Sequence, residues 1–217
     1  MAGAALVLPD LQLERAFLEE CGAGCVAGVD EAGRGALAGP VFAAAVVLPL
    51  GDPHLLAVLQ GVRDSKLLSA AARARFFPVI CDHAVAFGVG QADAPTIDRV
   101  NILAATRLAM VAAIHALAPA AAALLIDGPI RLAAVALPQR GVIRGDRLSL
   151  SIAAASILAK VSRDRHMIAL DAQYPGYGFA RHKGYGTAEH LAALAALGPC
   201  PEHRLSFAPL RPAAGAE

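Results

Sequence analysis

Four acidic residues stand where apolar segments of the chain stop. Asp30 and Glu31 end one apolar run, Asp127 ends a second directly before a Gly-Pro pair, and Asp146 lies between a predicted strand and a long predicted helix. Carboxylates at the ends of neighbouring strands can converge on hard divalent cations, and a pair of such ions can clamp the attacking and leaving oxygens of a phosphodiester. Turn formation or helix capping explains Asp146 equally well. Adjacent strand residues point to opposite faces, so Asp30 and Glu31 share a site only if the strand bends or ends between them.

The turn Gly33-Arg34-Gly35 follows the first acid pair after a single alanine. Glycines let a backbone approach a ligand closely, and consecutive N–H groups in such a turn can form an anion-binding concavity. Arg34 adds a cation beside the acids. An ordinary hairpin turn with a solvated arginine is the alternative, and the nearby acids favour the binding interpretation.

No pair of histidines in the sequence is convincingly placed for metal-free acid–base cleavage of a phosphodiester. Of its seven histidines, His182, His190 and His203 lie in the polar C-terminal region. We expect these three to be surface residues. The hypothesis is therefore in-line attack by water with metal assistance, leaving 5′-phosphate and 3′-hydroxyl ends.

Ser149, Ser156 and Lys160 are spaced by seven and four residues, which places them on one face of a helix. We predict that this stripe contacts a nucleic-acid backbone, with Lys160 on a phosphate, although a solvent-facing stripe would have the same spacing. Tyr185, between two glycines, can stack on a sugar or base, or it can fold back onto the domain.

The order of elements predicts an α/β fold in which helices flank a mixed sheet. A tight Gly turn predicts that the first two strands form a hairpin. We expect three parts: a helical lead-in over 1–24, a catalytic domain over 25–172, and a small helical C-terminal extension over 173–217 whose tail is loose from Ala208. Expected helices are 10–22, 69–82, 96–117, 148–170 and 187–197; expected strands are 25–30, 40–49, 84–90, 121–126 and a last one drawn from 132–137 and 141–144.

Composition limits the class of protein. The 217 residues are 57% hydrophobic and 17% charged, which excludes a disordered chain. No apolar run is long enough for a membrane span, no basic residue precedes the N-terminal apolar stretch as in a signal peptide, and four cysteines without CxxC spacing make zinc motifs and disulfide frameworks implausible. We expect a cytoplasmic protein without a membrane partner. The net charge is −3 over residues 1–139 (9 basic, 12 acidic) and +4 over 140–217 (10 basic, 6 acidic), which permits phosphate binding by the C-terminal part.

Six blocks, in the same order along the chain, resemble the motifs of bacterial ribonuclease HII. They cover the chain from about residue 26 to 207, so a chance match is very unlikely. The blocks are Gly28–Val41, Asp64–Leu67, Ile97–Met110, Ser149–Lys160 with the following Arg163–Arg165, His182–Thr187, and Arg204–Phe207.

The resemblance implies a ribonuclease H-like sheet and two Mg²⁺ or Mn²⁺ ions, with the family's four acids at Asp30, Glu31, Asp127 and Asp146. It implies a monomeric enzyme that cuts RNA–DNA hybrids and duplex DNA containing single ribonucleotides. It also implies that the Gly-Arg-Gly turn senses the 2′-hydroxyl and that the tyrosine packs on the next sugar. The expected substrate contacts are Gly33, Arg34, Gly35, Ser65, Lys66, Ser149, Ser156, Lys160, Lys183 and Tyr185.

Three alternatives remain at this point. A resolvase-type nuclease of the same superfamily would share the acids but would not detect a 2′-hydroxyl. A non-catalytic nucleic-acid-binding module would bind without metal, and the full set of four acids argues against it. Ribonuclease HIII carries an extra N-terminal domain, for which the 24 residues before Cys25 are too few.

Overall fold

The computed structural model of the protein describes residues 8–211, with a five-stranded mixed sheet at its centre. The strand order is β3-β2-β1-β4-β5. Strand β1 pairs antiparallel with β2, and β2 with β3, whereas β4 runs parallel to both β1 and β5. The expected hairpin and the expected mixed α/β sheet are confirmed. The strands are β1 (Val26–Ala32), β2 (Val41–Val47), β3 (Ala86–Ala92), β4 (Ala123–Asp127) and β5 (Gln139–Val142).

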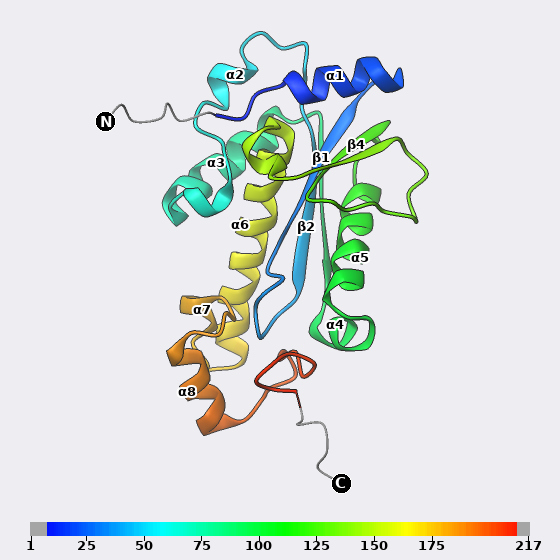
Figure 1. The fold of residues 1–217 in the computed structure, drawn as a ribbon. Coiled ribbons are helices and arrows are strands. Elements are labelled where there is room, and N and C mark those ends of the chain that lie inside the picture. The colour runs from blue at the N-terminus through cyan, green and yellow to red at the C-terminus, as the bar shows by residue number, and fades with distance from the viewer. Residues whose placement is uncertain (1–7, 212–217) are drawn as a thin grey trace, which may run out of the picture.

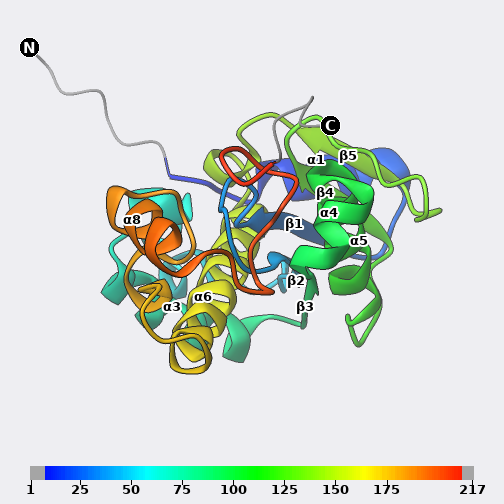
Figure 2. The same ribbon diagram turned by 90° about the horizontal axis from the view of Figure 1, so that it is seen from below.

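Two long helices cover opposite faces of this sheet. Figure 1 shows α5 on one side of the strands and α6 on the other, and Figure 2 shows the same layers from below. Helix α6 (Leu150–Gln173) passes over β1 and β2, and α5 (Ile102–His115) packs on β2 and β3. The other elements are α1 (Gln12–Cys21), α2 (Leu55–Val58), η1 (Ser65–Leu67), α3 (Ala70–His83), α4 (Ala94–Val100), η2 (Gly145–Arg147), α7 (Phe179–His182) and α8 (Ala188–Leu197).

Small residues let both helices approach the sheet closely. Every residue of β2 is buried; Ala43 and Ala45 face the core under α5, whereas Ala44 faces the core under α6. At Gly28 a Cβ atom would lie 2.2 Å from the carbonyl carbon of Ser151 in α6. Since side chains at such positions would push the layers apart, the alanine-rich strands serve close packing.

The helix expected over 96–117 is two helices, because the chain turns sharply at Asn101. Its φ is 67° and its ψ is 165°, a backbone conformation that residues other than glycine rarely adopt. Its side-chain oxygen accepts hydrogen bonds from the N–H groups of Leu103 and Ala104 and so caps α5. Helix α4 therefore stops where α5 starts.

The expected strand over 132–137 is wrong. Leu132 and Val135 are buried against the α5 side of the core, but their backbone pairs with a side chain instead of a strand. The Gln139 carboxamide donates to both of their carbonyl oxygens and accepts from the Leu132 N–H. This satisfies a buried loop without a ladder, and β5 begins only at Gln139.

Helix α1 is fastened to the start of α6 by one buried carboxylate. Glu14 Oε1 accepts hydrogen bonds from the Ser149 hydroxyl at 2.6 Å, the Ser151 hydroxyl at 2.7 Å and the Ser151 N–H at 2.9 Å. A negative charge at a helix N-terminus is stabilised by the free N–H groups there. Residues 1–7 of the expected lead-in and 212–217 of the expected tail lie outside the described residues. Between residues 8 and 211 every helix is too short or too polar to cross a bilayer.

The three C-terminal histidines are buried, so their expected surface position is wrong. The ring of His182 stacks on that of His190 with centroids 4.4 Å apart, and His190 Nε2 lies 3.1 Å from His203 Nε2. The Nδ1 atom of His190 hydrogen-bonds the Tyr185 carbonyl oxygen. Burial, together with the neighbouring His190, lowers the pKa of His203 to about 4. Neutral rings can satisfy one another's donors and acceptors, which the polar local sequence does not indicate.

Candidate active site

Asp30 and Asp127 lie side by side on neighbouring strands. Val29 of β1 pairs with Ile126 of β4 in parallel register, and the two acids directly follow this pair. Residues in register on adjacent strands, about 4.8 Å apart, point to the same face. The strand pairing therefore brings both carboxylates to one edge of the sheet.

Asp146 reaches the same edge through η2, the short helix after β5. Asp127 Oδ1 accepts hydrogen bonds from the Gly145 N–H at 2.7 Å and the Asp146 N–H at 3.4 Å. Glu31 is the last but one residue of β1, and its Oε1 accepts from Arg34 at 3.0 Å. The structure thus brings together the four predicted acids, which we call the acid cluster.

Burial and mutual repulsion raise the pKa values of the acids in the acid cluster. Burial, and then the charges of Glu31 and Asp127, raise the pKa of Asp30 well above its ordinary value. Burial raises the pKa of Glu31 although Arg34 opposes the rise. Burial, with Asp127 and Asp64 nearby, raises the pKa of Asp146 to about 6. Mutual repulsion of this kind is relieved when a cation binds between the carboxylates.

The donor set fits hard divalent ions, which take oxygen ligands. Glu31 Oε2 is buried and has no hydrogen-bond partner, so this oxygen is available to a ligand. Among residues 8–211, no three Asp, Glu, His or Cys side chains stand ready to ligate a single ion. Asp127 Oδ1 accepts from the Gly145 N–H and Glu31 Oε1 accepts from Arg34, which leaves the second oxygen of each carboxylate for an ion.

A hollow of about 280 Å³ opens beside the acid cluster and contains most of the predicted substrate contacts. Its walls come from the turn after β1, from η1, from α6 and from the loop after α7. Segments far apart in the sequence therefore form one surface. The residues that line it are Glu31, Ala32, Gly33, Arg34, Gly35, Ser65, Lys66, Lys160 and Tyr185.

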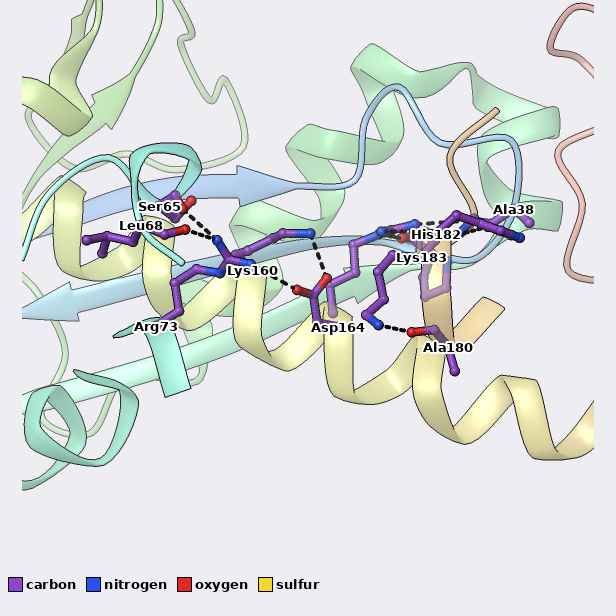
Figure 3. Close-up of polar contacts among 12 residues, drawn as sticks. Ala38, Ser65, Leu68, Arg73, Lys160, Asp164, Ala180, His182 and Lys183 are labelled. Carbon is purple, nitrogen blue, oxygen red and sulfur yellow. Dashed lines mark hydrogen bonds and ion pairs between the residues drawn. The ribbon is translucent and has the colours of Figure 1, made fainter. Parts of the chain in front are cut away.

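The turn that presents Lys66 is built by residues that the sequence analysis did not single out. Arg73 donates to the carbonyl oxygens of Ser65 at 2.9 Å and Leu68 at 2.6 Å (Figure 3). Asp64 is buried, caps η1 through the Lys66 N–H, and lies close enough to raise the pKa of Asp146. Burial alone would lower the pKa of Lys66, but the surrounding acids, Asp30 first, raise it. Asp64 follows a loop, whereas the sequence prediction selected only acids at the ends of apolar segments, so it did not include Asp64 among the site residues.

Lys160 is held by its neighbours at the edge of the hollow. Its Nζ donates to Asp164 at 2.6 Å (Figure 3) and lies 5.6 Å from the centroid of the Tyr185 ring. Asp164 also pairs with Arg73 at 3.7 Å. Lys183 lies outside this hollow, and its ammonium group donates to the Ala180 carbonyl.

The two serines of the predicted polar stripe do not face solvent, whereas Lys160 lines the hollow. Ser149 is fully buried as the helix N-cap and bonds Glu14. Ser156 is 1% exposed, and its hydroxyl accepts the Ser65 N–H and donates to the Ala153 carbonyl. Both hydroxyls are used inside the protein, so the prediction that they contact nucleic acid is wrong. Spacing identified the shared face but not that the face packs against α1 and η1.

The fold defines the class of protein. Ribonuclease H2 of Pyrococcus horikoshii OT3 superposes with a TM-score of 0.71 over 86% of this chain and 95% of that one, at 25% identity. Bst-RNase HIII in complex with Mn²⁺ shares the fold with a TM-score of 0.59 over 90% of this chain and 78% of that one, at 23% identity. The sheet and the two covering helices are those of the ribonuclease H-like fold.

Sequence comparison then gives the family. The family model of ribonuclease HII matches residues 27–210. Ribonuclease HII of Geobacter metallireducens is 59% identical over 182 residues, which are 84% of this chain and 83% of that protein. The chain belongs to the ribonuclease HII family, and it is a ribonuclease H endonuclease. Membership argues against the resolvase, binding-module and ribonuclease HIII alternatives.

Proposed function

We propose that the protein hydrolyses the RNA strand of RNA–DNA hybrids and also cuts on the 5′ side of single ribonucleotides embedded in duplex DNA, with two Mg²⁺ or Mn²⁺ ions. The observation that carries this proposal is the single hollow in which Glu31 of the acid cluster adjoins the Gly33–Gly35 turn. The acid cluster would cleave the phosphodiester, and the Gly33–Gly35 turn would detect the 2′-hydroxyl of the same nucleotide.

The proposed metal ligands are the carboxylates of the acid cluster. These carboxylates would hold divalent ions, which would supply activation of water for in-line attack on phosphorus and stabilisation of the leaving 3′-oxygen. Asp30 and Asp127 supply carboxylates from rigid strands, which fixes their separation better than loops would. Asp146 and Glu31 complete the set. The products carry 5′-phosphate and 3′-hydroxyl ends, and the 2′-hydroxyl is read without acting as the nucleophile.

The proposed substrate contacts come from both the sheet and the extension. The Gly33–Gly35 turn reads the 2′-hydroxyl, and Tyr185 packs on the following sugar. Residues 173–217 contribute Tyr185 and Lys183. Every proposed ligand and contact comes from one chain, so a monomer suffices. The proposed phosphate contacts are Ser65, Lys66, Lys160 and Lys183.

The test is cleavage of a labelled duplex that carries one ribonucleotide, beside an all-DNA duplex and a longer RNA–DNA hybrid. We expect cuts in the first and third substrates only, only with Mg²⁺ or Mn²⁺, and a cut 5′ to the ribonucleotide that leaves a 3′-hydroxyl. Equal cutting of all-DNA duplex would instead indicate a resolvase-type nuclease. Tight binding without cutting would indicate a binding module.

A further inference from the structure

Two buried arginines lie behind the Gly33–Gly35 turn. The side chains of Arg163 and Arg204 are both 0% exposed, and neither forms an ion pair with a carboxylate within residues 8–211. Burying an unpaired charge costs several kcal/mol unless its N–H groups find acceptors. The hydrogen-bond acceptors of these guanidinium groups therefore indicate which part of the structure the two arginines stabilise.

The Arg204 side chain donates hydrogen bonds to backbone carbonyl oxygens of the β1–β2 connection. Its Nη1 donates to the Arg34 carbonyl oxygen at 2.8 Å and its Nη2 to the Gly33 carbonyl oxygen at 2.8 Å. Its Nε and Nη2 also donate to the Gly39 carbonyl oxygen at 3.0 and 2.8 Å. One side chain thus grips both ends of the connection across a sequence separation of 165 to 171 residues.

These contacts set the direction of two peptide groups. A trans peptide is planar, so its C=O and its N–H point in opposite directions. Because the carbonyls of Gly33 and Arg34 point inward to Arg204, the N–H groups of Arg34 and Gly35 in the same peptide units point the other way. Neither N–H donates a hydrogen bond to any other part of residues 8–211, and both residues line the hollow.

We propose that Arg204 is a positioning residue that sets the enzyme's preference for ribose, by holding the turn so that two backbone N–H donors face the 2′-hydroxyl. The inference rests on the proposed function and adds a determinant of its selectivity. Lysine cannot replace this residue, because one ammonium group cannot span three carbonyls as a planar guanidinium does.

Arg163 supports the same turn from below. Its Nε donates to the Pro40 carbonyl at 3.0 Å, and a Cβ atom at Gly33 would lie only 1.9 Å from that Nε. Its Nη1 donates to the Lys183 carbonyl at 2.9 Å, and its guanidinium lies 5.4 Å from the Tyr185 ring. The turn and the tyrosine loop therefore rest on one rigid base.

The test compares Arg204→Lys with the wild type in steady-state cleavage of the single-ribonucleotide duplex, with unlabelled all-DNA duplex as inhibitor. We expect KM for the ribonucleotide duplex to rise about fivefold to tenfold, the effect of one or two lost hydrogen bonds. The inhibition constant of all-DNA duplex should stay within about twofold, since phosphate contacts are unchanged. A role confined to stability would lower the active fraction, and hence kcat, without moving the ratio of the two constants.

Two further variants keep the test decisive. Ile80→Ala, at a buried residue of α3 remote from the turn, should lower Tm by a comparable amount and leave the ratio unchanged. Asp98→Ala removes the carboxylate that accepts from Leu205 N–H, Ser206 N–H and the Ser206 hydroxyl, and it should shift the ratio in the same direction by a smaller factor.

Each outcome decides. An unchanged ratio in Arg204→Lys overturns the inference, and if that variant does not fold, an unchanged ratio in Asp98→Ala does so. A wild-type enzyme that cuts both duplexes, or neither, contradicts the proposed function instead. The two failures are therefore distinguishable.

Discussion

The Gly33–Gly35 turn directly follows two members of the acid cluster in the sequence, but different interactions hold the cluster and the turn in place. Asp30 and Asp127 are placed by the pairing of β1 with β4, which short apolar segments specify. The turn is placed by Arg204, a side chain from the far end of the described chain. We expect from this contrast that the hydrolytic chemistry depends on the sheet, whereas the choice of substrate depends on how the segment that carries Arg204 packs against the turn.

The largest expected effect comes from the sheet. Asp127→Asn should reduce cleavage by more than about a hundredfold, since even residues that merely orient metal ligands are worth up to that factor. Asparagine keeps an oxygen that can accept the Gly145 N–H, so Tm should change little. The measurement is turnover of the single-ribonucleotide duplex in Mg²⁺, with thermal unfolding as control. Activity within tenfold of wild type would rule out a ligand role for Asp127.

The next effect tests whether the start of α6 supports the fold independently of substrate choice. Glu14→Ala removes an acceptor of three hydrogen bonds and leaves Ser149 and Ser151 partly unsatisfied. We expect a loss of about 4 kcal/mol in the free energy of unfolding by urea, from several bonds to a buried charge. The ratio of KM to the all-DNA inhibition constant should stay at the wild-type value. A changed ratio would mean that α1 also governs selectivity.

Acid should weaken the packing of the C-terminal extension around His203. The pKa of His203 is about 4 in the folded protein and about 6.5 when unfolded, so the unfolded chain binds more protons between these values. The contribution of His203 to the free energy of unfolding is therefore fully present above about pH 6.5. It is lost as the pH falls toward 4, by up to about 3 kcal/mol. Urea unfolding at several pH values measures this slope. His203→Gln, which cannot titrate, should show a shallower slope, and equal slopes would contradict the prediction.

The smallest effect concerns a single phosphate contact. Lys160→Ala should reduce the slope of log binding constant against log salt by roughly one unit. Asp164→Asn frees Lys160 from its ion pair and provides the matched control, which should keep the wild-type slope or steepen it. A wild-type slope in Lys160→Ala would show that this lysine only pairs with Asp164.

The sequence predicted the sheet and the acid cluster well for a physical reason. Each acid ends or follows an apolar segment, and short apolar runs of this kind indicate buried strands. The same local reasoning did not separate α4 from α5, because the break between them depends on the capping side chain of Asn101. It also predicted a strand over 132–137, where the Gln139 carboxamide makes the hydrogen bonds that a neighbouring strand would have made.

The remaining errors share another cause, which is burial of polar groups by distant partners. Ser149 meets Glu14, Ser156 meets Ser65, and His190 meets His203. No local pattern distinguishes a buried, satisfied polar side chain from an exposed one. For the same reason Arg163, Arg204 and Asp64 escaped notice as site-building residues, although all three fell inside motifs of the family.

Asp98 anchors the segment that carries Arg204, and this has a consequence for the order of synthesis. Domains begin to fold as the chain emerges from the ribosome, N-terminal parts first. Strands β1 and β4 are synthesised long before the segment whose Leu205 and Ser206 N–H groups donate hydrogen bonds to Asp98. In a growing chain the strands that carry Asp30 and Asp127 are therefore available for folding before the segment that carries Arg204, so the Gly33–Gly35 turn waits longest for the side chain that holds it.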